Sequence, residues 1–383
     1  MHTKPRALRH FVVAITAGAS VLVPAAPAAA ERGPITDVEA VRAGLDGIVG
    51  ADRVPGALAE VRDRRGRSVT VTSGTAEAGT DLPMVDGDGR FRIASVTKTF
   101  VAVAVLRLVA RDQVRLDAPI EAYLPGVVRG TGAGSAIDGR DITVRQLLQN
   151  TSGLPDYVEH LDLTGPVEAA DLLRLALSHE PDFAPGQGWR YSNTGFIVAG
   201  MLVERLTHQD IGTAVTELAI RPAHLTDTYW PPAGERAIRG PHARNYAVDE
   251  ADPAGPLVDV TEFEPSWAGA SGAMVSTPSD LNRFWQELLG GRLLPRRALA
   301  EMQALVPAPE LGPGAAYGLG VVRLPLPCGG HAWAHGGDLG GGGVATVSGR
   351  DDSGRAATVY ITALTGGTGV DRMLGTFHAA LCA

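Results

Sequence analysis

Two residues in the segment FRIASVTKTF (91–100) have the types and spacing that nucleophilic catalysis requires. Ser95 and Lys98 are three residues apart at the start of an apolar run that predicts a buried helix, so they would share one helix face. Lysine occurs only at positions 4 and 98, and all other Lys/Arg positions are arginine. Burial lowers the pKa of a lysine, whereas a guanidinium stays charged, so a lysine can accept the serine proton near neutral pH. The alternative is a snorkelling or ion-paired Lys98 without a catalytic role.

A second candidate group lies in PGQGWRYSNTGF, which contains Tyr191, Ser192 and Asn193. A phenol beside a lysine can share its proton and act as general base or acid. Asn193, expected in an extended loop, would point the same way and could hold a substrate amide. The alternative is an ordinary turn, because Ser-Asn-Thr-Gly is common turn chemistry.

A third candidate group lies in AWAHGGDLGGGG, where His335 ends a strand-like piece. Gly336 and Gly337 would let a ligand lie directly against the strand backbone. The backbone N–H near Asp338 could pair with that of Ser95 to form an oxyanion hole. The alternative here is also a turn without function.

The elements that must position these groups come from both ends of the chain. Residues 36–50 have helical spacing, and 56–63 and 67–74 form two strands joined by a tight turn. Residues 115–245 contain helical patches between Pro- and Gly-rich loops, and the remaining tail returns to strands before a helix at about 369–380. This order predicts one sheet built from both termini with an inserted helical region.

The first thirty residues predict a signal peptide. Lys4, Arg6 and Arg9 precede an apolar stretch, and small residues lead to a cleavage point near Ala30. A membrane anchor is the alternative, but the apolar run is short for spanning a bilayer. We therefore expect a secreted protein without a membrane anchor. Cleavage would change the formal net charge from −8 to −11, which argues against nucleic acid or an anionic membrane as partner.

Two cysteines, Cys328 and Cys382, lie in the expected mature chain. In a secreted protein an even pair most simply forms a disulfide, which would stabilise the fold by roughly 4 kcal/mol through loop closure. Two free thiols or a catalytic cysteine are the alternatives. The sequence has no H-E-x-x-H or paired-cysteine zinc pattern, no G-x-S-x-G elbow and no nucleotide-binding glycine loop. We expect neither a metal nor a cofactor.

The order S-x-x-K, then Y-S-N, then H-G-G resembles the serine β-lactamase and penicillin-binding family of class C type. Within it, the secreted actinomycete D-alanyl-D-alanine carboxypeptidases look most similar, over essentially the whole mature chain. The resemblance implies an α+β fold, in which an antiparallel sheet is flanked by helices on both faces with an inserted all-helical region. It implies a sheet subdomain at about 31–114 and 246–383 and a helical subdomain at about 115–245. The segments that carry it are FRIASVTKTF, LLQNTSGLPDY, YSNTGFIVAG and SGAMVSTPSDLNRF.

The resemblance also implies roles for single residues. Ser95 would be the acylated nucleophile, and Lys98 and Tyr191 would transfer its proton. Asn193 would contact the acyl-side amide of the substrate, and His335 would provide hydrogen bonding or positive potential. Trp267 would form an aromatic wall of the cleft, or belong to the core.

One position departs from the family pattern. Where relatives have a hydroxyl residue that helps to hold the substrate's terminal carboxylate, this chain has Gly336. Arg323 could supply that contact, or be a surface arginine. H-G-G also occurs in relatives that are esterases or D-aminopeptidases, so strict carboxypeptidase specificity is in doubt while acyl-enzyme chemistry is not.

We expect a monomeric hydrolase acting on peptides that end in D-Ala-D-Ala, such as cell-wall stem peptides. β-Lactams would acylate Ser95 as inhibitors. The alternatives are a class C β-lactamase, an esterase of the same fold, and a binding or sensor protein that captures cell-wall peptides or β-lactams without turnover.

Overall fold

A computed structural model describes residues 38–161, 165–249, 252, 254–340 and 343–382. The expected signal peptide lies outside the described residues. The main sheet has eight strands in the order β2-β1-β12-β11-β10-β9-β8-β7, and every neighbouring pair is antiparallel. Its strands are β1 (Gly56–Arg62), β2 (Ser68–Gly74), β7 (Val306–Pro307), β8 (Ala316–Tyr317), β9 (Val322–Pro325), β10 (His331–Leu339), β11 (Val344–Asp351) and β12 (Ala356–Ile361).

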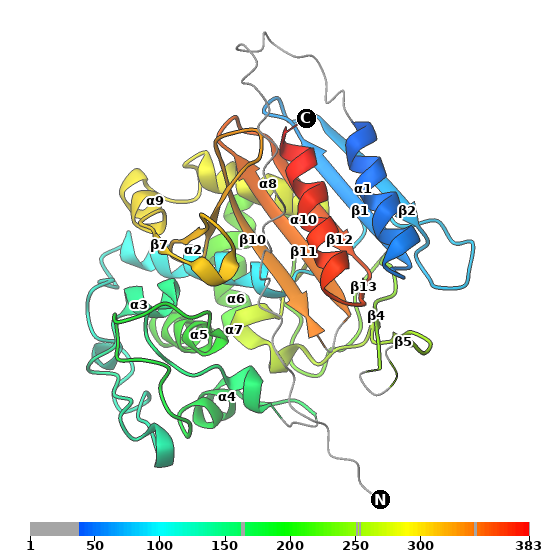
Figure 1. The fold of residues 1–383 in the computed structure, drawn as a ribbon. Helices are drawn as coiled ribbons and strands as arrows, with labels where there is room; N and C mark the ends of the chain where they lie inside the picture. Colours follow the sequence, from blue (N-terminus) through cyan, green and yellow to red (C-terminus); the bar gives the residue numbers. More distant parts are fainter. Residues whose placement is uncertain (1–37, 162–164, 250–251, 253, 341–342, 383) are drawn as a thin grey trace, which may run out of the picture.

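The sheet joins the two ends of the chain, as the sequence predicts. β1 pairs with β12 over six residues, from Ala57 opposite Ile361 to Arg62 opposite Ala356. α1 (Val38–Ala51) and α10 (Gly367–Cys382) lie side by side over one face of the sheet (Figure 1). A disulfide joins Cys328, in the turn before β10, to Cys382 at the end of α10.

The opposite face is covered by α8 (Pro278–Leu289), which contacts β1, β11 and β12. Thr277 caps this helix by accepting a hydrogen bond from the Asp280 N–H. The fully buried Trp285 of α8 donates from its indole to the Ser348 hydroxyl of β11 at 2.9 Å. Helices therefore flank both faces, which confirms the predicted α+β architecture.

The helical region lies to one side of the sheet (Figure 1). Residues 115–245 contain α3 (Val144–Gln149), α4 (Ala169–Ala176), α5 (Asn193–Thr207) and α6 (Ile211–Val215), and none of the eight sheet strands lies among them. In the part of the chain that the structure describes, no helix has the length and apolar composition needed to cross a membrane. Two further helices lie outside this region, α7 (Gly269–Gly272) and α9 (Arg296–Met302). There are also two small sheets. One pairs β3 (Phe91–Arg92) with β6 (Val275–Ser276), and the other contains β4 (Tyr246–Ala247), β5 (Val258–Asp259) and β13 (Ala363–Leu364).

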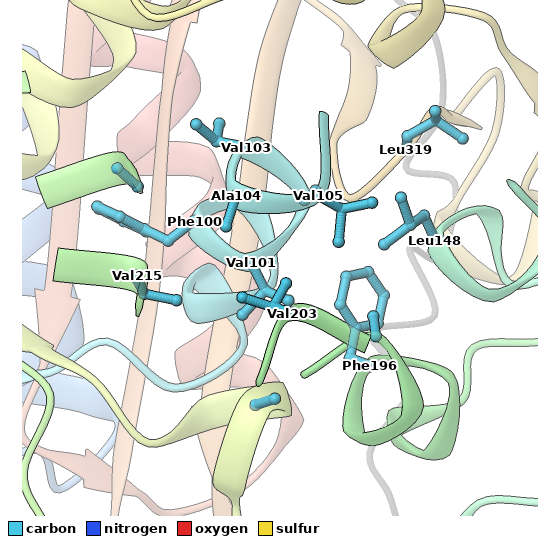
Figure 2. Packing of buried hydrophobic residues seen from close by; sticks show 14 of the residues in the cluster. Phe100, Val101, Val103, Ala104, Val105, Leu148, Phe196, Val203, Val215 and Leu319 are labelled. Atoms are coloured by element: carbon cyan, nitrogen blue, oxygen red, sulfur yellow. The ribbon is translucent and has the colours of Figure 1, made fainter. Parts of the chain in front are cut away.

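The central helix is α2 (Thr97–Val109), which begins two residues after Ser95. Its residues from Thr97 to Leu106 are all fully buried, as the uniformly apolar sequence predicts. Figure 2 shows side chains of α2 packed among residues from α3, α5, α6 and the segment before β9. Lys98 is fully buried too, because it lies in the first turn of this enclosed helix. The packing of α2 thus fixes the environment of the one lysine in the described chain.

Candidate active site

Ser95 lies in a single 3-10 turn, Ala94–Val96, that leads into α2. The preceding residue, Ala94, has φ of 47°, a left-handed conformation that is unfavourable for a residue with a Cβ. The turn is anchored because the Ile93 N–H donates to the Met274 carbonyl at 3.0 Å. A strained, well-anchored turn at a half-buried serine is the geometry expected of a nucleophile that must be presented to a substrate.

Lys98 contacts Ser95 directly. Its Nζ lies 2.9 Å from the Ser95 Oγ, 2.7 Å from the Asn193 Oδ1 and 2.8 Å from the Ser271 carbonyl oxygen. Burial lowers the pKa of Lys98 to about 7, although the negative charges of Asp156 and Asp338 oppose this shift. A substantial fraction of Lys98 is therefore a neutral amine near pH 7.

The three contacts of Lys98 fit that neutral amine. Two N–H groups can donate to the Asn193 and Ser271 oxygens, since both atoms are acceptors only. The remaining lone pair then faces the Ser95 hydroxyl at a distance suited to proton transfer. The same contacts can also hold an ammonium, which has three donors. Lys98 can therefore take the Ser95 proton without moving.

Tyr191 also contacts Ser95. Its hydroxyl hydrogen-bonds the Ser95 side chain, and the Lys98 Nζ lies 4.9 Å from its ring centroid. Burial and the nearby Tyr317 raise the pKa of Tyr191 well above its usual value. Tyr191 is therefore a neutral phenol near pH 7, which suits it to donate a proton rather than to remove one.

Asn193 is the first residue of α5 rather than part of an extended loop, so the loop prediction is wrong. Its Oδ1 accepts from Lys98, and its Nδ2 donates to the Asp156 carboxylate at 2.8 Å. The helix N-terminus fixes the direction of the side chain more firmly than a loop would. Both ends of the amide contact protein groups, while the contact with a substrate amide stays a prediction.

β10 passes directly against the Ser95 turn. A Cβ added to Gly337 would lie 2.4 Å from the Ile93 carbonyl oxygen and 3.1 Å from the Ser95 nitrogen, so only glycine fits here. The pairing of β10 with β9 ends at Ala334, while its pairing with β11 continues to Leu339. Alternate N–H groups beyond Ala334 therefore point away from β11 and can serve, with the Ser95 N–H, as oxyanion donors.

His335 precedes these glycines and is buried. Its Nδ1 lies 2.5 Å from the Gly336 carbonyl oxygen, and its Nε2 lies 3.1 Å from the Tyr317 hydroxyl. Because a carbonyl only accepts, Nδ1 carries the proton and Nε2 accepts from Tyr317. Burial and the Lys98 charge lower the pKa of His335 to about 3. Of the two roles expected for His335, hydrogen bonding or positive potential, the contacts fit hydrogen bonding, because a neutral imidazole supplies no positive potential.

Two further candidates, Trp267 and Arg323, have contacts with other parts of the chain. The Trp267 indole donates to the Gly165 carbonyl at 2.8 Å and packs edge-on against Phe263 at 5.7 Å between ring centroids. Arg323 lies in β9 opposite Trp333, two residues before His335 along β10, and its buried Nε has no hydrogen-bond partner among the described residues.

The exposed face of the β10 edge contains Gly336 and Asp338, and His335 and Gly337 lie on its buried face. The Asp338 charge acts on both Lys98 and Tyr191. No three His, Cys, Asp or Glu side chains of the described residues gather where they could hold a metal ion.

Residues that the sequence patterns did not identify contact Lys98 and Asn193. Asp156 contacts Asn193, and the Ser271 carbonyl contacts Lys98. The fully buried Tyr157 hydroxyl lies 3.1 Å from the Ser271 Oγ and donates to the Trp267 carbonyl at 2.8 Å. Asp156 and Tyr157 belong to LLQNTSGLPDY, one of the segments that carry the family resemblance, and membership of that segment is the sequence feature that could have identified them. Ser271 opens another such segment, SGAMVSTPSDLNRF, but it contacts Lys98 through its backbone carbonyl, which does not depend on the residue type.

The sequence profile described as "Beta-lactamase" matches residues 39–380. The chain belongs to this beta-lactamase family. Esterase EstB of Burkholderia gladioli is 30% identical over 328 residues, which cover 78% of this chain and 81% of that protein. This beta-lactamase-family chain is therefore similar to an esterase over most of its length.

Solved structures give the same fold. A D-stereospecific amidohydrolase from Streptomyces sp. matches with a TM-score of 0.79 at 37% identity, covering 89% of this chain and 98% of the other. D-amino acid amidase from Ochrobactrum anthropi SV3 matches with a TM-score of 0.75 at 28% identity and the same coverage. The chain is a hydrolase of the serine beta-lactamase fold, and these named relatives are an esterase and amidases rather than carboxypeptidases.

Proposed function

We propose that this protein is a serine hydrolase that cleaves amides of D-amino acids through an acyl-Ser95 intermediate. The observation that carries the proposal is the buried Lys98 amine, which has a pKa of about 7 and lies 2.9 Å from the Ser95 Oγ. Secretion, and acylation by β-lactams, belong to the same proposal.

Each step can be assigned to a group at the site. The Ser95 oxygen attacks the carbonyl carbon while its proton passes to the Lys98 amine. The N–H groups of Ser95 and of the β10 edge stabilise the oxyanion. When the C–N bond breaks, the leaving nitrogen takes a proton from the Tyr191 phenol, and the Lys98 ammonium restores that phenol. Water then attacks the ester carbon while one of its protons passes to the neutral Lys98 amine. When the bond to the Ser95 oxygen breaks, that oxygen takes a proton back from Lys98 and the acid is released.

The charge around the site supports an amide over a peptide with a terminal carboxylate. Gly336 offers no hydroxyl to bind a carboxylate, and Asp156 and Asp338 both place negative charge near Lys98. A substrate with a free amine and an uncharged amide avoids this repulsion. The similarity to a D-stereospecific amidohydrolase and a D-amino acid amidase points to the same substrate class.

Carboxypeptidase action on D-Ala-D-Ala ends is the second candidate, and Arg323 favours it. A buried guanidinium nitrogen without a partner among the described residues, two residues from His335 along the sheet, is a possible anchor for a carboxylate. Ester hydrolysis uses the same acyl-enzyme chemistry and is expected alongside either activity.

The test compares D-phenylalanine amide, L-phenylalanine amide, a D-Ala-D-Ala-ending tripeptide, a p-nitrophenyl ester and a fluorescent penicillin, on wild type and Ser95→Ala. We expect ammonia release from the D-amide to exceed that from the L-amide, and D-alanine release from the tripeptide to be slow. Intact mass should show an adduct on wild type and none on Ser95→Ala, whose turnover should fall at least about 10³-fold.

Two results would contradict the proposal. Faster release of D-alanine than of ammonia would establish the carboxypeptidase instead. Equal activity of wild type and Ser95→Ala would mean that Ser95 is not the nucleophile.

A further inference from the structure

Asp156 is a buried carboxylate that the catalytic steps above do not use. Its residue is only 3% exposed, although an aspartate is costly to bury without partners. Its Oδ1 accepts from the Val158 N–H at 3.2 Å, and its Oδ2 accepts from the Asn193 Nδ2 at 2.8 Å. One carboxylate oxygen thus holds the turn that follows, and the other points toward the catalytic lysine through Asn193.

The contact with Asn193 decides which way that amide faces. An asparagine side chain has one accepting and one donating end, and rotation by 180° exchanges them. A carboxylate only accepts, so Asp156 selects the orientation in which Nδ2 faces it. The accepting Oδ1 then faces Lys98 at 2.7 Å. The opposite orientation would set N–H groups against the Lys98 N–H groups and free the lysine to turn away from Ser95.

The charge of Asp156 acts on Lys98 as well. Lys98 must become an ammonium when it takes the Ser95 proton, yet it is fully buried. Asp156 and Asp338 both favour that ammonium, which opposes the effect of burial on the Lys98 pKa. Asp156 is enclosed, whereas Asp338 faces solvent, so salt and water screen Asp338 more.

We propose that Asp156 is the positioning residue of the Ser95–Lys98 pair: it fixes the Asn193 amide toward Lys98 and supplies the buried negative charge that stabilises the ammonium. The proposal rests on the proposed function, because it assigns Lys98 the role of proton acceptor. Other titratable groups surround Asp156 and Lys98, and they are the same in wild type and in the Asp156 variants. Around Asp156 they are Tyr157, His160, Asp182 and Tyr191, and around Lys98 they are Tyr191, His335 and Asp338.

Two substitutions separate the two effects. Asp156→Asn keeps an oxygen that can accept from Asn193 but removes the charge, and Asp156→Ala removes both. Asp280→Asn is the matched control: Asp280 is also buried, its Oδ2 accepts from the Asp227 N–H and the Thr228 hydroxyl at 2.8 Å each, and it does not act on Lys98. Thermal unfolding of each variant shows whether it folds.

The readout is the protonation of Lys98 itself. Lysine occurs at positions 4 and 98 only, so ¹³C-lysine labelling gives at most two side-chain signals, and Lys98→Arg assigns them. An exposed lysine titrates near pH 10.4, far from the value of about 7 for Lys98. The pH dependence of kcat/KM on the amide is recorded in parallel. We expect its acidic limb to follow the Lys98 titration, because activity needs the free amine.

We expect Asp156→Asn to move the Lys98 midpoint, and the acidic limb, down by about one pH unit. Asp156→Ala should show the same shift and a further ~10-fold loss of kcat, because the Asn193 amide is free to rotate. Asp280→Asn should leave the midpoint unchanged. An unchanged Lys98 midpoint in a folded Asp156→Asn would overturn the inference. The NMR titration is independent of turnover, so a failure of the proposed function would appear separately, as an inactive wild type.

Discussion

Lys98 is enclosed by protein on every side, whereas the β10 edge across from it faces solvent through Gly336 and Asp338. On the lysine side, each polar contact is made by another protein group: the Asn193 amide, the Ser271 carbonyl and the Ser95 hydroxyl. On the β10 side, the pairing with β9 ends at Ala334, and Gly336 and Asp338 beyond it are exposed.

The difference separates chemistry from specificity. A lysine with a pKa near 7 requires burial and fixed partners, because water would restore its usual value. Substrate selection requires the opposite, since groups that recognise a ligand must be reachable. In the mechanism we propose, the enclosed side therefore sets how the acyl-enzyme forms, and the open edge sets which acyl compounds reach Ser95.

The largest expected effect comes from changing the enclosed side. Lys98→Arg keeps a cation of similar length but cannot release its proton near neutral pH. We expect kcat/KM for an ester or amide to fall by about 10² to 10⁴-fold and to stay low up to pH 10. The measurement is the pH–rate profile of Lys98→Arg beside Lys98→Met. If activity returned at high pH in Lys98→Arg but not in Lys98→Met, a side chain that stays protonated would be sufficient. Release of a proton by residue 98 would then not be the property that limits the rate.

The enclosed side is also where the sequence was most informative. Lys98 stands out because it is the only lysine in the expected mature chain, where every other Lys/Arg position is arginine. Its spacing from Ser95 predicts that the two side chains are in contact, and the structure contains this contact. Asp156 was not identified, because its action passes through Asn193, a residue 37 positions away. Contacts of this kind depend on how α5 and the LPDY turn meet, which no local pattern encodes.

The fold follows the same division. The buried character of α2 and the pairing of strands from both termini could be predicted, because apolar runs and alternation are local signals. Asn193 was expected in an extended loop, with an ordinary turn at Ser-Asn-Thr-Gly as the alternative, and the packing of α5 overrides both. His335 was expected to provide hydrogen bonding or positive potential, and the burial against Tyr317 that decides between them cannot be read from the H-G-G motif.

A second, smaller effect is expected where the two sides meet. Gly337→Ala places a methyl group 2.4 Å from the Ile93 carbonyl oxygen and 3.1 Å from the Ser95 nitrogen, which forces β10 away from the nucleophile turn. We expect the rate of Ser95 acylation to fall by about 10²-fold, because the oxyanion donors shift. Gly336→Ala is the matched control, since its nearest heavy atom would be the Thr346 carbonyl oxygen at 3.8 Å. Equal losses in both variants would indicate a general intolerance of β10 to side chains.

The smallest effect concerns the charge of the open edge. Asp338→Asn removes a negative charge from the exposed face that it shares with Gly336. We expect the ratio of kcat/KM for a carboxylate-ending D-Ala-D-Ala peptide to that for a D-amino acid amide to rise about 2- to 5-fold, the size of an exposed charge interaction. The ratio is the correct quantity because Asp338 also raises the Lys98 pKa, and that effect cancels between two substrates at one pH.

The control for Asp338→Asn is Asp352→Asn, which makes the same change in net charge in the turn between β11 and β12, where the Asp352 carboxylate is 60% exposed. Salt adds a second criterion, because a screened interaction requires the gain in the ratio to shrink as ionic strength rises. An equal gain in Asp352→Asn would assign the preference to the overall charge of the protein. An unchanged ratio in Asp338→Asn would leave the missing hydroxyl at Gly336 as the feature of the edge that disfavours a carboxylate.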